Sequence, residues 1–262
     1  MKNRLKFLLV LFPVMAIGQT TTQNYIKTTT YKQPFAEANL PTVPTTAQAS
    51  QNVTYFDGLG RPIQQVASQQ SGSGKDIITH IEFDDFGRQT QEYLPFKSES
   101  SSMAFDPAAK ANTTSYYGSP NPALNGNPAL EATGYPFSQK ELEASPLNRI
   151  LKQAAPGNDW RSGSGREIKI DYQTNVAGEV KLFKANTVWN AEAGLYTISF
   201  VNSGNYAANE LYKTITYDEN TAATPLEING STVEFKNKED QVVLKRTYDA
   251  QVRHDTYYVY DI

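Results

Sequence analysis

The sequence predicts an all-β fold of stacked antiparallel β-hairpins, with long loops and one short helix. Three observations support this prediction. The chain contains 16 Tyr and 12 Phe, and aromatic residues favour half-exposed β-sheet. Some segments, such as residues 77–83, alternate between apolar and polar residues, which is the pattern of a half-buried strand. A turn motif also occurs twice in the same form.

The first 18 residues predict a secretory signal peptide. Three basic residues precede an apolar run over residues 7–17, and Ala16-Ile17-Gly18 offers small residues for cleavage. A membrane anchor is the alternative, but a spanning helix needs about 20 apolar residues. We therefore expect export to the cell surface or the medium, with no stable membrane span after cleavage.

A Thr-, Gln- and Pro-rich segment over residues 19–50 comes next, and the main β region follows at residues 51–262. Residues 26–31 are expected to form one strand. Pro41 and Pro44 mark a linker before the first strand of the main region.

The repeated motif reads aromatic-Asp-x-x-Gly-Arg. Its first copy is Phe56-Asp57-Gly58-Leu59-Gly60-Arg61, and its second is Phe83-Asp84-Asp85-Phe86-Gly87-Arg88. The aromatic residue ends an incoming strand, and Asp can bind the backbone two residues on and open a turn. Gly supplies the positive φ that closes the turn. Arg starts the outgoing strand, with its long side chain expected over a neighbouring ring.

Each copy therefore predicts a β-hairpin. Because one hairpin is marginally stable in water, we expect several hairpins to stack edge to edge. The residues to which we assign this structural role are Phe56, Asp57, Gly60, Arg61, Phe83, Asp84, Gly87 and Arg88.

Aromatic-Asp pairs also occur outside the two motifs, which brings the number in the whole chain to six. Chance would give roughly one or two pairs in the whole chain. Pro107 makes the third pair the weakest, since proline would disrupt the turn. The six pairs are Phe56-Asp57, Phe83-Asp84, Phe105-Asp106, Tyr217-Asp218, Tyr248-Asp249 and Tyr260-Asp261.

The two motifs resemble YD repeats of the RHS (rearrangement hotspot) class. Over about residues 20–262, the ordered series of segments is similar to the N-terminal region of secreted RHS-repeat proteins of Bacteroidota, a domain of unknown function. Beyond the two motifs, the matching segments are residues 74–80, 93–96, 145–150, 155–157, 209–213, 218–220, 242–246 and 254–261.

This resemblance implies a longer protein. Family members normally continue with many more repeats, so we expect the chain to be truncated at its C-terminus. The self-cleaving core and the variable toxin-like tip of the family have no counterpart here, and no activity is carried over from them.

The pattern predicts about twelve short strands in all. Residues 97–136 are expected to be irregular. Ser138-Gln139-Lys140-Glu141 has the form of a capping box and predicts one short helix to about Ala144. Residues 226–235 predict a type I′ hairpin around Asn229-Gly230.

Composition argues against several kinds of site. The chain has no Cys, which excludes disulfides and thiolate metal sites. Its net charge of −3 argues against a nucleic-acid partner. His80 and His254 are far apart in sequence, and no acidic segment has the spacing of a calcium loop. We expect no cofactor and no metal.

Three functional interpretations follow. The first is a secreted or cell-surface structural module, the N-terminal part of an RHS/YD-repeat shell, without catalytic activity. Its partners would be downstream RHS repeats or other cell-envelope proteins. The alternative is a carbohydrate- or protein-binding module that uses Trp160 or Trp189. A hydrolase is disfavoured, because residues 161–165 only half resemble a Gly-x-Ser-x-Gly nucleophile motif.

Overall fold

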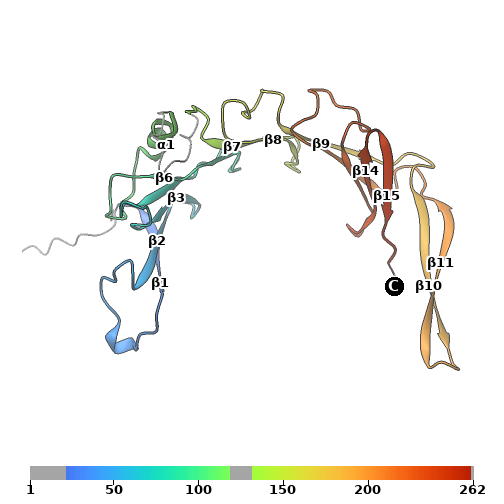
Figure 1. Ribbon diagram of the computed structural model, residues 1–262, viewed down its shortest axis with the longest axis horizontal. Helices are drawn as coiled ribbons and strands as arrows, with labels where there is room; N and C mark the ends of the chain where they lie inside the picture. The colour runs from blue at the N-terminus through green and yellow to red at the C-terminus, as the bar shows by residue number, and fades with distance from the viewer. Residues whose placement is uncertain (1–21, 119–131, 261–262) are drawn as a thin grey trace, which may run out of the picture. The chain divides into compact units, whose positions relative to one another are not determined.

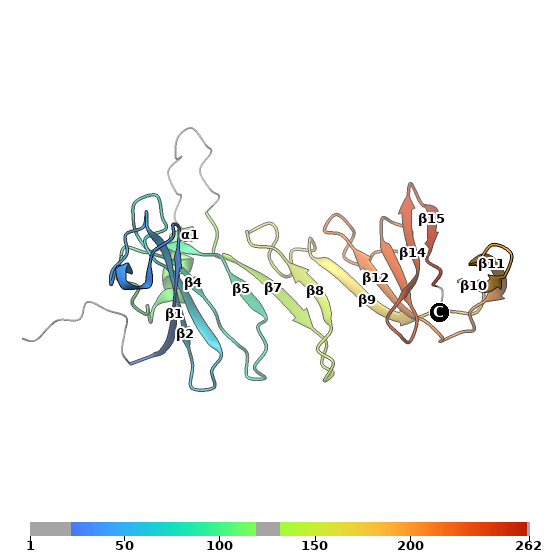
Figure 2. The same cartoon turned by 90° about the horizontal axis from the view of Figure 1, so that it is seen from below.

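The computed structural model describes residues 22–118 and 132–260, and the chain divides into two compact units (Figures 1 and 2). Unit 1 holds the described residues up to Glu82 together with Tyr93–Tyr116. Unit 2 holds Phe83–Glu92 and the described residues from Tyr117 onward. The predicted signal peptide at residues 1–18 and Asp261 of the last aromatic-Asp pair lie outside the described residues.

Antiparallel strands are the predominant secondary structure of the described chain, which confirms the all-β prediction. Unit 1 contains a five-stranded sheet in the order β1-β2-β3-β4-β6. Its elements are β1 (Asn24–Tyr31), the 3₁₀ helix η1 (Glu37–Asn39), β2 (Ala49–Phe56), β3 (Pro62–Ala67), β4 (Ile77–His80) and β6 (Phe96–Lys97).

Strand β2 shows why unit 1 forms a sheet. Its residues alternate between buried and less buried along the strand, so that Val53 and Tyr55 lie fully inside. β1 pairs along its whole length with β2. The predicted strand at residues 26–31 is therefore part of the unit 1 sheet.

The one α-helix of the described residues lies elsewhere than predicted. α1 (Ala109–Gly118) forms within the segment expected to be irregular. The Asp106 carboxylate accepts a hydrogen bond from the Ala108 amide (2.9 Å) just before the helix. Asp106-Pro107 thus begins a helix, where a proline in the first turn costs no hydrogen bond.

The helix predicted at residues 138–144 is wrong. Residues 138–142 lie instead in β7 (Phe137–Leu142), which pairs with β8 (Ile150–Ala154). Glu141 forms an ion pair with Lys152 of β8 (3.2 Å) instead of capping a helix. Cross-strand pairing overrides the local capping pattern here.

Unit 2 is built around an eight-stranded sheet in the order β15-β14-β13-β12-β9-β8-β7-β5. Its core holds eight buried apolar residues, among them Leu211, Ile215, Phe235 and Leu244. The strands not yet given are β5 (Gln91–Tyr93), β9 (Ile168–Thr174), β12 (Tyr212–Tyr217), β13 (Thr232–Lys236), β14 (Val242–Asp249) and β15 (Val252–Tyr257).

The type I′ hairpin predicted around Asn229-Gly230 is also wrong. Residues 226–230 form a turn, closed by a hydrogen bond from the Asn229 amide to the Leu226 carbonyl (2.9 Å). A two-residue hairpin loop of that kind connects β14 and β15 instead. Its central residues, Ala250 and Gln251, both have positive φ (46° and 68°).

Two strands of unit 2 stand outside the eight-stranded sheet (Figure 1). β10 (Lys181–Asn190) and β11 (Leu195–Asn205) pair only with each other, and we call them the ribbon. At its base, the Phe183 ring packs edge-on against the Tyr257 ring of β15 (centroids 5.0 Å apart).

Candidate functional site

The first copy of the motif closes the β2–β3 hairpin. The Asp57 amide donates to the Arg61 carbonyl (2.9 Å), and the Gly60 amide donates to the Asp57 carbonyl (3.1 Å). The Asp57 carboxylate accepts from the backbone amides of Leu59 and Arg61 (2.9 Å each). Its second oxygen accepts from Arg61 Nε (2.8 Å). Gly60 has φ 78°, the positive value that the sequence predicts.

The second copy has the same local bonds. The Asp84 carboxylate accepts from the amides of Phe86 (3.0 Å) and Arg88 (2.8 Å) and from Arg88 Nε (2.8 Å). Gly87 has φ 76°. The Arg88 guanidinium lies over the Phe86 ring at 5.0 Å, as expected for this arginine, and also donates to Asn148 Oδ1 (2.8 Å).

The two copies differ in what surrounds them. Phe56 is the last residue of β2, whereas β4 ends at His80, three residues before Phe83. β4 and β5 belong to different sheets, so the second copy does not close a hairpin, contrary to the prediction. The Lys140 amide of β7 donates to the Thr90 carbonyl (2.9 Å), just before β5. The turn alone therefore does not determine which strand pairs with the outgoing strand. That partner is set by hydrogen bonds beyond the turn, which place β5 in the sheet of β7 and not in that of β4.

These bonds hold both aspartates in the ionised form. The backbone amide of Arg61 is the largest cause that lowers the pKa of Asp57, and the amide of Arg88 does the same for Asp84. The adjacent guanidinium adds to each effect. An ionised aspartate is therefore part of the turn as folded.

The same backbone turn occurs at two further places that the motif did not reveal. Asn237 takes the place of Asp in the β13–β14 turn: its side-chain oxygen accepts from the amides of Glu239 (3.0 Å) and Gln241 (2.9 Å). Asp240 takes the place of Gly, with φ 62°. The Asn237 amide donates to the Gln241 carbonyl (3.0 Å), which matches the bond from Asp57 to Arg61.

The β3–β4 connection repeats the turn with a serine. The Ser71 amide donates to the Lys75 carbonyl (3.1 Å), and Ser71 Oγ accepts from the Lys75 amide (2.8 Å). Gly74 supplies the positive φ of 69°. A short polar residue followed three positions later by a residue in the left-handed region is the signal that finds all four turns.

A longer turn, from Glu143 to Arg149, closes the β7–β8 hairpin. Arg149 Nε donates to both carboxylate oxygens of Glu143 (3.0 Å each), and Arg149 Nη2 adds a third bond (2.8 Å). These bonds and one from Ser145 lower the pKa of Glu143 to about 2. Carboxylate–guanidinium pairing thus closes this hairpin as well.

Unit 2 carries a buried cluster of charges on the core face of its sheet. Lys213 of β12 contacts Glu179 (2.8 Å) and Glu227 (2.7 Å). Arg246 of β14 contacts Asp255 of β15 (2.8 Å). The Lys213 and Arg246 side chains are only 8% and 4% exposed. We call these five residues the charge cluster.

The cluster is packed against an aromatic ring and is internally satisfied. Lys213 Nζ and the Arg246 guanidinium lie 5.5 and 5.3 Å from the centre of the Phe235 ring. Among the described residues, no buried side-chain nitrogen or oxygen lacks a hydrogen-bond partner. The cluster therefore joins β14 to β15 and links β12 to the segments that carry Glu179 and Glu227.

Burial and pairing act in opposite directions on the cluster's pKa values. Burial raises the pKa of Glu227, but hydrogen bonds from Lys213 and Tyr248 bring it below its ordinary value. Burial lowers the pKa of Lys213, but Glu179 and Glu227 raise it above its ordinary value. Burial and the Glu227 carboxylate raise the pKa of Tyr248 to about 12. All these groups keep their usual charge at neutral pH.

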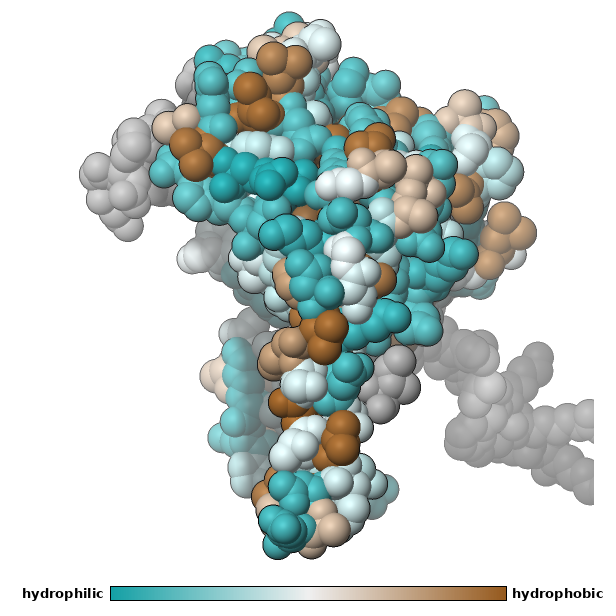
Figure 3. Space-filling model, turned by 90° about the vertical axis from the view of Figure 1, so that its right-hand side faces the viewer, coloured by the Kyte–Doolittle hydropathy of each residue, from teal (hydrophilic) through white to brown (hydrophobic). Residues whose placement is uncertain are grey.

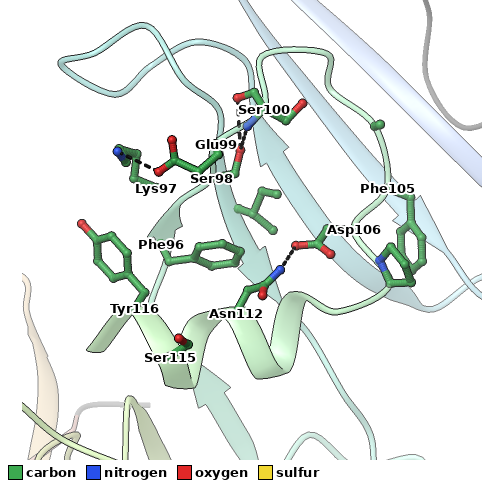
Figure 4. Close-up of a pocket in the computed structure, with 13 residues that line it drawn as sticks. Phe96, Lys97, Ser98, Glu99, Ser100, Phe105, Asp106, Asn112, Ser115 and Tyr116 are labelled. Atoms are coloured by element: carbon green, nitrogen blue, oxygen red, sulfur yellow. Dashed lines mark hydrogen bonds and ion pairs between the residues drawn. The ribbon is translucent and has the colours of Figure 1, made fainter. Parts of the chain in front are cut away.

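Unit 1 contains a cavity of about 470 Å³ between α1 and the segment that follows β6 (Figure 4). The rings of Phe96 and Tyr116 lie on one side, with centroids 6.3 Å apart. Polar groups lie opposite, where Asn112 Nδ2 donates to the Asp106 carboxylate (2.8 Å). Aromatic faces beside amide, carboxylate and serine groups suit a small polar ligand with one apolar face.

His80 belongs to a second polar group of unit 1. Its ring packs edge-on against the Tyr93 ring (5.1 Å), and Nε2 lies 3.4 Å from Glu82. Lys110 Nζ (2.8 Å) and the Tyr93 hydroxyl (3.0 Å) both donate to Glu82. Burial acts to raise the pKa of Glu82, but these bonds lower it.

None of the remaining candidates lines this cavity. Trp160 is half-buried under the Arg166 guanidinium (5.4 Å), and Trp189 lies on the ribbon, 54% exposed. His254 is an exposed residue of β15. Among the described residues, no three His, Asp or Glu side chains gather to hold a metal ion. No helix of the described chain is long and apolar enough to cross a membrane.

The fold and the turns define an antiparallel β-sheet protein of two units with recurrent hydrogen-bonded turns. The family model that matches is Domain of unknown function (DUF6443), over residues 27–174. This match covers more than half of the 262 residues, and the chain belongs to that family. It includes both copies of the motif and the unit 1 cavity, but not the ribbon. No curated protein matches the chain.

Proposed function

We propose that the chain is a secreted or cell-surface structural module, the N-terminal part of an RHS/YD-repeat shell, without catalytic activity of its own. The observation that carries the proposal is the recurrence of one turn. Three successive connections along the chain, at residues 57–61, 71–75 and 84–88, use the same backbone hydrogen bonds. A unit that repeats its connections can extend a β wall by adding strands.

The charge distribution supports the same proposal. The buried ionic contacts of the charge cluster join β14 to β15 through Arg246 and Asp255, and join β12 to the loop residues Glu179 and Glu227, all within unit 2. The edge strand β15 pairs with β14 on one side only within the described sheet. An open strand edge offers backbone groups to a further strand. Downstream RHS repeats or envelope proteins are the partners that this edge would take.

Crosslinking on the exporting cell tests the proposal. The chain, expressed with residues 1–18 and a C-terminal tag, should be recovered from the envelope or medium with Gln19 as its first residue. Mass spectrometry of crosslinked peptides should place chains with Tyr-Asp-x-x-Gly repeats next to β15. Retention in the cytoplasm, or crosslinks from β15 only to proteins without such repeats, would contradict the proposal.

A second candidate function is a carbohydrate- or protein-binding module, which the unit 1 cavity favours. Its aromatic and polar lining suits a sugar ring better than does Trp160, which is half-buried beneath an arginine. A glycan array should then show a specific signal that is lost in Phe96→Ala and Asn112→Ala and kept in Trp160→Ala. An array without any specific signal, or a signal lost only in Trp160→Ala, would argue against the cavity.

A further inference from the structure

The ribbon has one face without charge. Strand alternation and the β10–β11 register place the side chains of Trp189 and Tyr196 on the same face, where their rings contact each other (5.0 Å). The cross-strand pairs Thr187–Ile198 and Ala185–Phe200 continue this face toward the base. We call it the apolar face. Its eight residues are Phe183, Ala185, Thr187, Trp189, Tyr196, Ile198, Phe200 and Asn202.

Most of the apolar face is exposed. Phe200 is 70% exposed, Tyr196 65%, Trp189 54% and Ile198 52%. At the base, Phe183 is covered in part by Tyr257. Figure 3 shows hydrophobic residues gathered along the projecting ribbon.

A two-stranded ribbon with such a face requires a partner. An isolated hairpin is marginally stable in water, and three or more strands or a covering layer are normally needed. The opposite face does not have this problem, since it mixes Lys184, Asn186 and Thr197 with a few apolar residues. An exposed apolar patch of several hundred Å² marks an interaction surface.

Charge favours a second copy as the partner. The whole chain has a net charge of −3, so two copies carry like net charges, which oppose association through charged parts of their surfaces. None of the eight residues of the apolar face is charged, and β11 contains neither a charged residue nor a proline. Two apolar faces can therefore meet without bringing like charges together.

The area sets the strength of this contact. An aromatic side chain offers roughly 150–250 Å², so the exposed parts of Trp189, Tyr196, Phe200 and Ile198 offer roughly 300–600 Å² together. Two copies would bury about twice that area, which is below the 1,200–2,000 Å² of stable complexes and in the range of weak ones. The expected dimer is weak and depends on concentration.

We propose that the apolar face is a self-association surface, on which the ribbon of a second copy packs face to face around a twofold axis. This contact is separate from the β15 edge, because it uses side chains of one ribbon face and no open backbone edge. It also does not depend on the proposed shell function.

Single cysteines test the contact, because the chain has none of its own. Ile198 and Ser199 are neighbours in β11 whose side chains lie on opposite faces. Under mild oxidation, Ile198→Cys should form a disulfide-linked dimer and Ser199→Cys should remain monomeric. Equal crosslinking of both variants would indicate edge pairing of β11 and overturn the face-to-face proposal.

Sedimentation equilibrium gives the second measurement. The unmodified chain should shift from monomer to dimer between micromolar and millimolar concentration. Phe200→Asp should weaken the dimer at least about tenfold, a loss of about 1.4 kcal/mol, whereas Ser199→Asp should leave the dimer unchanged. Both variants alter exposed positions, and circular dichroism with melting checks that they fold.

Two further results would overturn the proposal. One is a chain that stays monomeric at millimolar concentration. The other is a monomer that sediments with neutral phosphatidylcholine vesicles through the same face, with binding lost in Phe200→Asp, because a lipid surface would then be the occupant.

Discussion

Carboxylate–arginine pairs occur in two settings in this protein, and they perform different tasks. In the turns, the Asp57 and Arg61 side chains are 21% and 36% exposed. In the charge cluster, the Arg246 and Asp255 side chains are 4% and 15% exposed. Both contacts are 2.8 Å long. Equal geometry therefore coexists with very different desolvation, and this difference governs what each pair contributes to stability.

The largest expected effect comes from breaking the buried pair. Arg246→Ala leaves Asp255 without its main partner in the unit 2 core, and should destabilise the protein by about 3–5 kcal/mol. Arg253 is the matched control: it also contacts Asp255 (3.5 Å) but is 57% exposed. Arg253→Ala should cost about 0–1 kcal/mol. Urea unfolding measures both, and similar losses would show that burial does not separate the two settings.

The next effect concerns backbone strain in the turns. Gly60→Val and Gly87→Val force a β-branched residue into positive φ and should each cost about 1–3 kcal/mol. Gly58 lies in the same turn without positive φ and with open space around it, so Gly58→Val should cost much less. Melting temperatures of the three variants test this, and an unchanged value for both Gly60→Val and Gly87→Val would refute the turn assignment.

A smaller effect separates the two roles of Asp57 in the turn, which are to accept hydrogen bonds from backbone amides and to form an ion pair with Arg61. Asp57→Asn keeps an oxygen that can accept the backbone amides, as Asn237 does in the β13–β14 turn. It should destabilise the protein less than Asp57→Ala does, since in Asp57→Ala both amides lose their acceptor. Chemical denaturation of the two variants compares them. If Asn proved as costly as Ala, the ion pair with Arg61 would be the dominant contribution.

The smallest expected effect is a loss of protein stability at acid pH. The folded pKa values of Asp84 and Glu143 lie below their ordinary values of 3.8 and 4.5, that of Glu143 at about 2. Each contribution is therefore complete above the ordinary value of its group; that of Glu143 is lost as pH falls toward about 2, and that of Asp84 is lost as pH falls below 3.8. Melting temperature should decline below about pH 4.5. The decline should be shallower in Asp84→Asn, and an unchanged slope would mean that this turn is not linked to acid stability.

The sequence predicted what short-range bonds determine. The alternating strands and the left-handed glycines at 60 and 87 follow from local residue chemistry. The errors arose where pairing with residues distant in sequence determines the secondary structure. Residues 138–142 form a strand because β8 pairs with them. Residues 226–228 do not form a strand, since Glu227 contacts Lys213 and Tyr248 instead.

The candidate sites were less accessible from sequence. The charge cluster joins residues up to 76 positions apart, from Glu179 to Asp255, and no local pattern marks it. The turn at Asn237 was not predicted, because Asn237 and Asp240 stand where the motif has Asp and Gly. The hydrogen-bond requirement, one acceptor and one left-handed residue, is conserved between the turns while the residue letters change.

The division of the chain limits how it can be dissected. Phe83–Glu92 belongs to unit 2 although it lies between two parts of unit 1, so the backbone passes from one unit to the other three times. No single cut in the gene separates them. A fragment of residues 22–116 would include Phe83–Glu92, which belongs to unit 2. A fragment that starts at residue 117 would lack β5 and the turn that contains Arg88. The two units can therefore be expressed intact only together, and the family match, which ends at residue 174 within unit 2, does not follow their boundaries.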